Sequence, residues 1–382
     1  TCASSAFAGT QDDQSLIGTS GNAAVQSSDS KPASYINDHF KLGSETLFNV
    51  QKTDATSRDD TTLGYRARLF LKYTTDGSDM LYIRLQARDM PDATNTSDFN
   101  AGIPVFGGGN GVSGNLNTDI ELNKIYYKFD LNKQVKVALG LLEDEYYVGN
   151  PFTSYAQDAV LKTFKKTQYF GETGMGAGLN FAINDSINLS TGVIVDEDNA
   201  QDPSNSMDDK FYSTSQLSMS DGDFSGGLRY TYSKGINEGQ VMYGSKEVST
   251  AATNASHIND INLAVNYAIN DDLSISATYG LSMIDVSGDS VDAQGWNIGI
   301  LAKNVLHDGD KMGVAIGSLQ QITSSDSSSN PETSNDPYAM ELWYKKDITK
   351  NVYVKPYLFH LKDMDSSGTD ITGVGLLTGI NF

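Results

Sequence analysis

The sequence has a single cysteine, Cys2, among its 382 residues. One cysteine excludes an intramolecular disulfide and a zinc site built from cysteines. No unbroken apolar stretch reaches the roughly 18 residues that a membrane-spanning helix needs, so a membrane role would have to use β-strands. Positive charge is also scarce, because 27 Lys and Arg stand against 48 Asp and Glu, a formal net charge of −21. Nucleic-acid binding depends on clustered positive charge, so we expect no nucleic-acid partner.

The N-terminal region carries a pattern typical of protein export. Ala6-Phe7-Ala8 has the small residues that signal peptidase recognises, although a chance occurrence is the alternative. We therefore expect residues 1–8 to be the end of a signal peptide. Residues 9–35 are polar, rich in Ser and Gly and without periodicity, so we expect a flexible leader there and a single β-domain over residues 36–382.

Most of that domain alternates apolar and polar residues with a period of two, which is typical of β-strands with one apolar face. In the first such run, Tyr65, Leu69 and Leu71 alternate with Arg66 and Arg68. The apolar faces that we assign in other runs are Leu81/Ile83/Leu85/Ala87, Val135/Val137/Leu139/Leu141, Ile187/Leu189/Thr191/Val193/Val195, Phe224/Gly226/Leu228/Tyr230/Tyr232, Leu273/Ile275/Ala277/Tyr279/Leu281 and Tyr353/Lys355/Tyr357/Phe359/Leu361. Runs of about ten residues, about sixteen in all, have the length of tilted strands that cross a bilayer.

The connections between these runs alternate in length. Short turns are expected at 76–77, 132–133, 184–185, 221–222, 270–271, 308–309 and 349–350. Long polar loops are expected at 51–61, 89–118, 143–172, 196–210, 233–257, 284–293, 321–337 and 361–371. This alternation predicts an all-β fold, a transmembrane antiparallel up-and-down β-barrel with short periplasmic turns and long external loops.

The last run supports a location in the bacterial outer membrane. Val374, Leu376 and Ile380 share one face, and the chain ends on the aromatic Phe382. This end resembles the terminal strand of bacterial outer-membrane barrels, in which it is the signal for assembly. The expected partners are therefore outer-membrane lipids and lipopolysaccharide. Aromatic residues near strand ends are expected to form girdles at the membrane interfaces: Tyr126, Tyr127, Phe211, Tyr212, Trp296, Trp343 and Tyr344.

Four arginines are expected to form a basic wall inside the pore. If the apolar faces of runs 62–73 and 79–89 meet lipid, then Arg66, Arg68, Arg84 and Arg88 point inward on two adjacent strands. The 143–172 loop begins with Glu143, Asp144 and Glu145 and is long enough to fold into the barrel. A basic wall that faces an acidic loop would place a transverse field across a narrow, water-filled constriction. The alternative is a wide pore with solvated arginines and a loop that stays outside.

Several segments resemble, in order, the OprB-like porins of cyanobacteria, a group described as iron-uptake or carbohydrate-selective porins. They are 66–69 with 79–88, 125–129, 176–181, 215–217 and 351–382. The resemblance implies a monomeric or homotrimeric diffusion channel. Members of that group usually carry a surface-layer-homology domain before the barrel, and residues 9–35 are too short for one.

The function expected from these patterns is a porin that passes ions and small hydrophilic solutes by passive diffusion. A channel selective for carbohydrate or for inorganic ions such as iron is the first alternative, and a barrel enzyme or an adhesin is the second. The four histidines have no paired spacing, so we expect neither a metal site nor a cofactor. We expect no enzymatic activity, since no spacing indicates a Ser/His or Asp/His pair.

Overall fold

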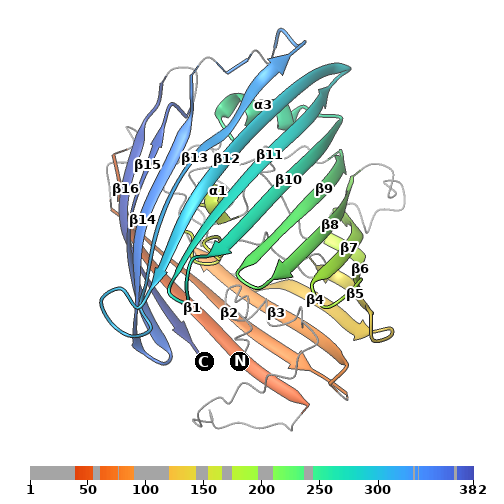
Figure 1. Cartoon of the computed structure of the whole chain (residues 1–382), viewed down its shortest axis with the longest axis vertical. Helices are drawn as coiled ribbons and strands as arrows, with labels where there is room; N and C mark the ends of the chain where they lie inside the picture. The colour runs from red at the N-terminus through yellow and green to blue at the C-terminus, as the bar shows by residue number, and fades with distance from the viewer. Residues whose placement is uncertain are drawn as a thin grey trace.

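The chain forms a closed β-barrel whose strands all pair antiparallel with their sequence neighbours, β1 also pairing with β16 (Figure 1). The computed structural model describes residues 39–54, 61–75, 77–89, 120–142, 154–165, 174–196, 210–235, 244–329, 332–333, 335–364 and 368–382. The strands are β1 (Phe40–Thr53), β2 (Thr62–Tyr73), β3 (Asp79–Asp89), β4 (Glu121–Asp130), β5 (Val135–Leu142), β6 (Gly174–Ala182), β7 (Ile187–Asp196), β8 (Phe211–Asp221), β9 (Phe224–Lys234), β10 (His257–Ala268), β11 (Leu273–Val286), β12 (Asp289–Lys303), β13 (Lys311–Ser325), β14 (Tyr338–Thr349), β15 (Val352–Lys362) and β16 (Ile371–Asn381). The predicted fold class and the predicted number of sixteen strands are confirmed.

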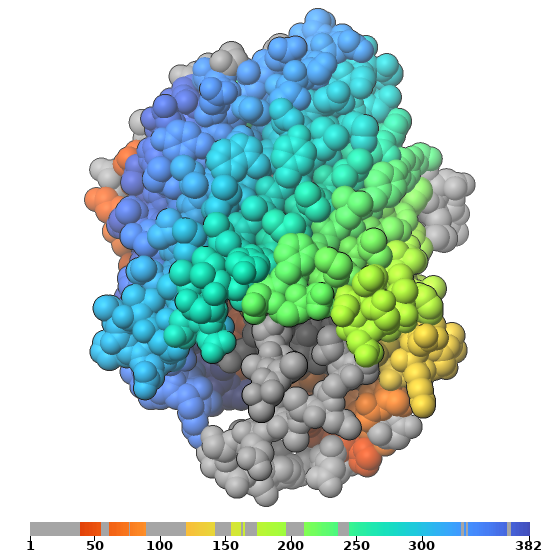
Figure 2. All heavy atoms as spheres, in the orientation of Figure 1, coloured from red at the N-terminus to blue at the C-terminus, as the bar shows by residue number. Residues whose placement is uncertain are grey.

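Alternation along each strand separates an apolar outer face from a mixed inner face. On β1, Phe48 and Val50 are exposed on the outside, whereas Asn49 and Gln51 are buried on the inside. The side chains of β9 to β13 form an unbroken outer surface (Figure 2). Such exposed aliphatic and aromatic side chains suit contact with lipid, and the polar residues between them explain the low overall hydrophobic content of 38%.

Turn chemistry sets the register at the end of the barrel where the chain also ends. Asn132, Asn184 and Asn270 each accept hydrogen bonds through their side-chain oxygen from the backbone amides two and three residues later. An asparagine that closes a turn in this way fixes which strand residues face each other. The predicted short turns fall where consecutive strands meet, with Asp221 and Thr349 as the last residues of β8 and β14; residue 76 of the first turn lies outside the described residues.

One predicted long loop, 284–293, is wrong. Strands β11 and β12 continue through most of this range and are joined by Ser287 and Gly288 alone, with φ angles of 57° and 99°. Two consecutive residues with positive φ favour the tight hairpin turn that matches the twist of its strands. The polar composition of the segment therefore reflects strands of 14 and 15 residues, β11 and β12, rather than a loop.

The C-terminal residue closes the barrel. Backbone hydrogen bonds of 2.9 Å join Phe382 and Ser44 in both directions, next to the β1–β16 ladder. Val374 and Leu376 are exposed on the outer face, as the alternation predicts. Strand pairing at this seam leaves no open sheet edge, which a membrane-embedded sheet cannot tolerate.

Apolar side chains also gather inside the barrel, and this overturns part of the predicted aromatic girdle. The face of β15 that carries Tyr357, Phe359 and Leu361 is buried on the inside, whereas Leu358 is exposed on the outside. Tyr126, Tyr212 and Trp343 also lie in buried interior clusters, so these three do not belong to an interfacial girdle. The physical reason is that chain segments pack against the inner wall and cover its aromatic residues.

Two short helices belong to these interior segments. Helix α1 (Lys162–Lys165) lies in the connection between β5 and β6, and α3 (Lys246–Thr253) lies in the connection between β9 and β10 (Figure 1). The buried residues Val248 and Ala251 of α3 join the cluster that contains Ile258 and Ile284 of the wall. Neither helix, nor any other in the described ranges, is long and apolar enough to cross a membrane.

Candidate functional site on the inner wall

Residues 154–165, part of the predicted 143–172 loop, lie against the inner wall formed by β10 to β15. The hydroxyl of Ser154 donates to Oδ1 of Asn266 on β10 at 2.7 Å and lies 2.6 Å from the hydroxyl of Ser274 on β11. Tyr155, Val160 and Phe164 continue the contact as members of a buried cluster with residues of β12 to β16. The described part of this loop is therefore inside the barrel.

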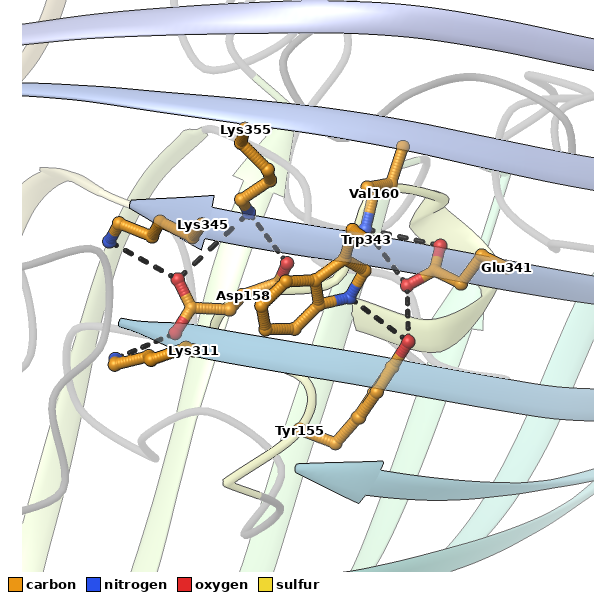
Figure 3. Close-up of polar contacts among 8 residues, drawn as sticks. All are labelled: Tyr155, Asp158, Val160, Lys311, Glu341, Trp343, Lys345 and Lys355. Atoms are coloured by element: carbon orange, nitrogen blue, oxygen red, sulfur yellow. Dashed lines mark hydrogen bonds and ion pairs between the residues drawn. The ribbon is translucent and has the colours of Figure 1, made fainter. Parts of the chain in front are cut away.

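Glu341 of β14 holds this segment through its carboxylate (Figure 3). Oε1 accepts from the Tyr155 hydroxyl at 2.8 Å and from the Val160 amide at 3.0 Å, and Oε2 accepts from the Leu161 amide at 2.6 Å. Burial and the neighbouring Glu341 carboxylate raise the pKa of Tyr155, so its hydroxyl remains a donor. One strand residue thus satisfies three donors of the loop in a place where Glu341 is only 3% exposed.

The ring of Tyr155 rests on a glycine of the wall. A Cβ atom on Gly299 of β12 would lie 2.4 Å from Cγ of Tyr155. The same ring is 5.9 Å from that of Trp343, whose Nε1 donates to the Tyr155 hydroxyl at 3.1 Å. Gly299 therefore provides the space in which the loop approaches the wall.

Replacing Gly299 with valine is expected to displace Tyr155 and loosen the loop. The added carbons overlap the ring, and overpacking of this kind costs about 1–3 kcal/mol. We expect faster proteolysis between residues 143 and 172 and a lower free energy of unfolding, measured by urea titration in lipid vesicles. In Tyr155→Ala the ring is absent, so adding Gly299→Val to that variant should cost much less. An equal cost in both backgrounds would contradict the role of Gly299.

Three lysines surround the carboxylate of Asp158 in the same segment. Its oxygens lie 2.8 Å from Nζ of Lys311, 3.4 Å from Nζ of Lys345 and 3.9 Å from Nζ of Lys355 (Figure 3). Burial alone would raise the pKa of Asp158, but the three ammonium groups hold it well below its ordinary value of 3.8. A depressed folded-state pKa stabilises the docked loop above pH 3.8, and this contribution is lost only as the pH falls from there toward the folded value.

The four predicted arginines lie on the inner faces of β2 and β3. Arg66 of β2 faces Arg88 of β3 in the strand register. Arg66 also forms a salt bridge of 2.6 Å with Glu45 of β1. The outer face of the same strands carries the exposed Leu63 and Leu69. Like charges that face each other repel, so their close placement depends on neighbouring carboxylates and amides.

The other members of this wall have such partners. Nε of Arg68 donates to Oε1 of Gln86, and Nε of Arg84 donates to Oδ1 of Asn123, both at 2.6 Å. Arg88 lies 4.0 Å from Glu121. The predicted acidic partners Glu143, Asp144 and Glu145 lie outside the described residues.

Hydroxyl and amide side chains cover the inner face of β8 to β11. Examples are Thr214, Gln216, Thr231, Asn262 and Thr278, all on the side opposite the exposed residues of their strands. These five side chains are 9% exposed or less, and the same face also carries the buried Arg229 of β9 and Asp260 of β10.

The structure also brings together Ser256, His257 and Asp285 near the long-loop end, a trio that sequence spacing did not reveal. The Ser256 hydroxyl donates to Oδ1 of Asp285 and lies 3.4 Å from Nδ1 of His257, which is itself 4.0 Å from Asp285. A catalytic serine donates to the histidine, and the acid orients the opposite ring nitrogen. This arrangement therefore lacks the geometry of a nucleophilic triad. Within the described ranges, no group of three His, Cys, Asp or Glu side chains could hold a metal ion.

Asp158 and Glu341, which together hold residues 154–165 on the inner wall and are called the latch below, were missed by the sequence analysis. Glu341 lies between the apolar Met340 and Leu342, and an isolated acid among apolar strand residues was the available signal. Asp158 lies in a loop with no periodicity, so only the structure places it beside its lysines. 

A closed barrel of sixteen antiparallel strands with a connecting segment packed inside it defines the porin fold class. Among solved structures, OprB of Pseudomonas putida at high pH superposes with a TM-score of 0.65 and 14% identity, over 90% of this chain and 94% of that one. An anion-selective porin from Comamonas acidovorans gives a TM-score of 0.57 and 13% identity, over 90% and 99% of the two chains. The trimer form of Vibrio cholerae OmpT gives 0.55 and 12%, also over 90% and 99%. The resemblance to OprB is thus confirmed at the level of the fold.

Sequence comparison shows less similarity to known proteins than structure comparison does. No protein-family model matches the chain. An uncharacterized protein of Synechocystis sp. is 22% identical over 377 residues, which cover 87% of this chain and 66% of that protein. The chain therefore spans slightly less than two thirds of that relative's length. The assignment to a cyanobacterial subgroup stays a prediction.

Proposed function

We propose that this chain is an outer-membrane porin through which ions and small hydrophilic solutes diffuse passively. The observation that carries the proposal is the docking of residues 154–165 on the inner wall of a closed sixteen-stranded barrel. A segment fixed inside a barrel of this size narrows the lumen, and the inner face of β8 to β11 carries polar rather than apolar side chains. Lipids and lipopolysaccharide surround the barrel in this proposal.

The basic inner wall favours anions as the preferred solutes. Arg66, Arg68, Arg84 and Arg88 share that wall with the buried Lys124 of β4. Fixed positive charge in a pore concentrates small anions and repels cations. The Comamonas porin of the same fold is described as anion-selective, which supports this choice. A homotrimer is the oligomeric state we propose, since OmpT of Vibrio cholerae was solved in a trimer form.

Single-channel recording in a planar bilayer tests the proposal. Detergent-refolded protein should give discrete, stable conductance steps, and its reversal potential in a KCl gradient should have the sign of anion preference. Correctly folded protein that gives no conductance would remove the porin function and leave an adhesin or a closed barrel.

Replacing both Arg84 and Arg88 with alanine is expected to shift the reversal potential toward cations. Two of the four arginine charges on the inner faces of β2 and β3 are lost, and a change of about twofold or more in the anion-to-cation permeability ratio is expected for charges at a constriction. A matched control is Lys133→Ala in the exposed turn between β4 and β5, which removes a positive charge away from the wall. Unchanged selectivity in the double variant would show that the arginines do not line the path.

A further inference from the structure

Lys311, Lys345 and Lys355 form one row across three adjacent strands of the inner wall. Lys311 of β13 faces Lys345 of β14 directly in the strand register. Lys355 of β15 lies at the same level, between the cross-strand pairs Trp343–Tyr357 and Lys346–Val354. Like charges on facing strand positions repel each other, so this row needs compensation.

The compensation comes from the docked loop and from aromatic rings. Asp158 reaches all three ammonium groups within 4.0 Å, and its backbone oxygen accepts from Nζ of Lys355 at 2.7 Å. Nζ of Lys345 also lies 4.5 Å from the ring centre of Tyr353, and Nζ of Lys355 lies 4.8 Å from the ring centre of Trp343. These contacts turn the ammonium groups toward the loop and the wall.

The position of the row matters for permeation because it lies inside the same barrel as the arginine wall. With Asp158 present, each lysine is ion-paired and at least partly buried. The side-chain exposures are 30% for Lys311, 20% for Lys345 and 7% for Lys355. Without that carboxylate, mutual repulsion would drive the flexible lysine side chains into the lumen. A second basic surface would then act on passing ions.

We propose that Asp158 is a selectivity-determining positioning residue, which keeps Lys311, Lys345 and Lys355 out of the ion path by binding all three. The proposal rests on the porin function above. It predicts that the charge of Asp158, and not its size, limits the anion preference of the channel.

The test compares Asp158→Asn, Asp158→Glu and a matched control. Asp158→Asn keeps the size of the side chain and removes its charge, so the anion-to-cation permeability ratio should rise about twofold or more as the lysines enter the path. Asp158→Glu keeps the charge and should stay close to the wild type. Asp185→Asn removes the same charge from the exposed turn between β6 and β7 and should also stay close to the wild type. A larger conductance in Asp158→Asn with unchanged selectivity would overturn the proposal, because it would show a steric role for the loop alone.

A second measurement does not depend on conduction and separates this inference from the porin function. An amine-reactive reagent applied to the folded protein, followed by mass spectrometry, should label Lys345 and Lys355 several-fold more in Asp158→Asn than in the wild type. Unchanged labelling overturns the inference even if the channel conducts, and increased labelling supports it even if the wild type gives no current. If Asp158→Asn folds poorly, Asp158→Asn/Lys345→Gln has less repulsion and should show labelling of Lys355 above the wild-type level. Wild-type labelling there would overturn the inference equally.

Discussion

Glu341→Ala is expected to release residues 154–165 from the wall and to produce one of the largest losses of stability in this barrel. The substitution leaves the Tyr155 hydroxyl and the amides of Val160 and Leu161 without their acceptor. Each buried donor left unsatisfied costs about 1–3 kcal/mol, so a loss of about 3 kcal/mol or more in the free energy of unfolding is expected. Urea titration of the protein folded in vesicles measures this loss, and limited proteolysis shows whether the loop has become accessible.

The matched variant is Glu341→Gln, which keeps the shape of the side chain and one acceptor oxygen. That oxygen can still serve some of the three donors, whereas the new amide group faces the donors of the loop without accepting from them. Glu341→Gln should therefore lose less stability than Glu341→Ala and show intermediate proteolysis. If both variants keep the loop as protected as in the wild type, then the apolar contacts of Tyr155 and Phe164 hold the loop without Glu341.

Release of the loop should also change the pore. With residues 154–165 no longer fixed by Glu341, the lumen widens and single-channel conductance should rise in Glu341→Ala. Asp158 would lose its fixed position beside the lysine row at the same time, so this variant alone does not separate the two parts of the latch. Comparing the single variants Glu341→Ala and Asp158→Asn separates the two roles. Only Asp158→Asn removes charge beside the lysines while keeping the acceptor of the Val160 and Leu161 amides.

Local patterns predicted the strands well, because a strand in a barrel obeys a period of two and turn residues act over only a few positions. Asn132, Asn184 and Asn270 each close a turn by accepting hydrogen bonds from the amides two and three residues later, so the local sequence contains the whole cause of the turn. The hairpin turn at Ser287 and Gly288 was missed because the ends of β11 and β12 that flank it carry polar residues. That composition is typical of a polar loop.

The faces of β15 could not be assigned from the sequence, because alternation distinguishes two faces without saying which meets lipid. Both faces of β15 carry apolar residues, Leu358 outside and Phe359 inside. The decisive partner of the inner face lies on another strand, where a Cβ atom on Gly373 would be only 2.3 Å from the ring of Phe359. The contacts of Asp158 and Glu341 could not be predicted for the same reason, because these residues meet their partners only when the barrel is closed and the loop lies inside it.

Ile298→Arg is expected to prevent stable insertion into a bilayer, and this result would test the outward assignment on which the membrane proposal depends. Ile298 lies near the middle of β12, exposed on the outer face beside Ile316 of β13. An arginine on the lipid face near the bilayer midplane costs about 2–4 kcal/mol, whereas one near the interface costs about 0–1 kcal/mol. Leu306→Arg is the matched control, because Leu306 is an exposed apolar residue in the turn between β12 and β13, outside the strands. Folding titrations in vesicles should therefore show a large loss for Ile298→Arg and little for Leu306→Arg. Equal, small losses would mean that β12 does not face hydrocarbon, because only a lipid environment makes the cost depend on depth along the strand.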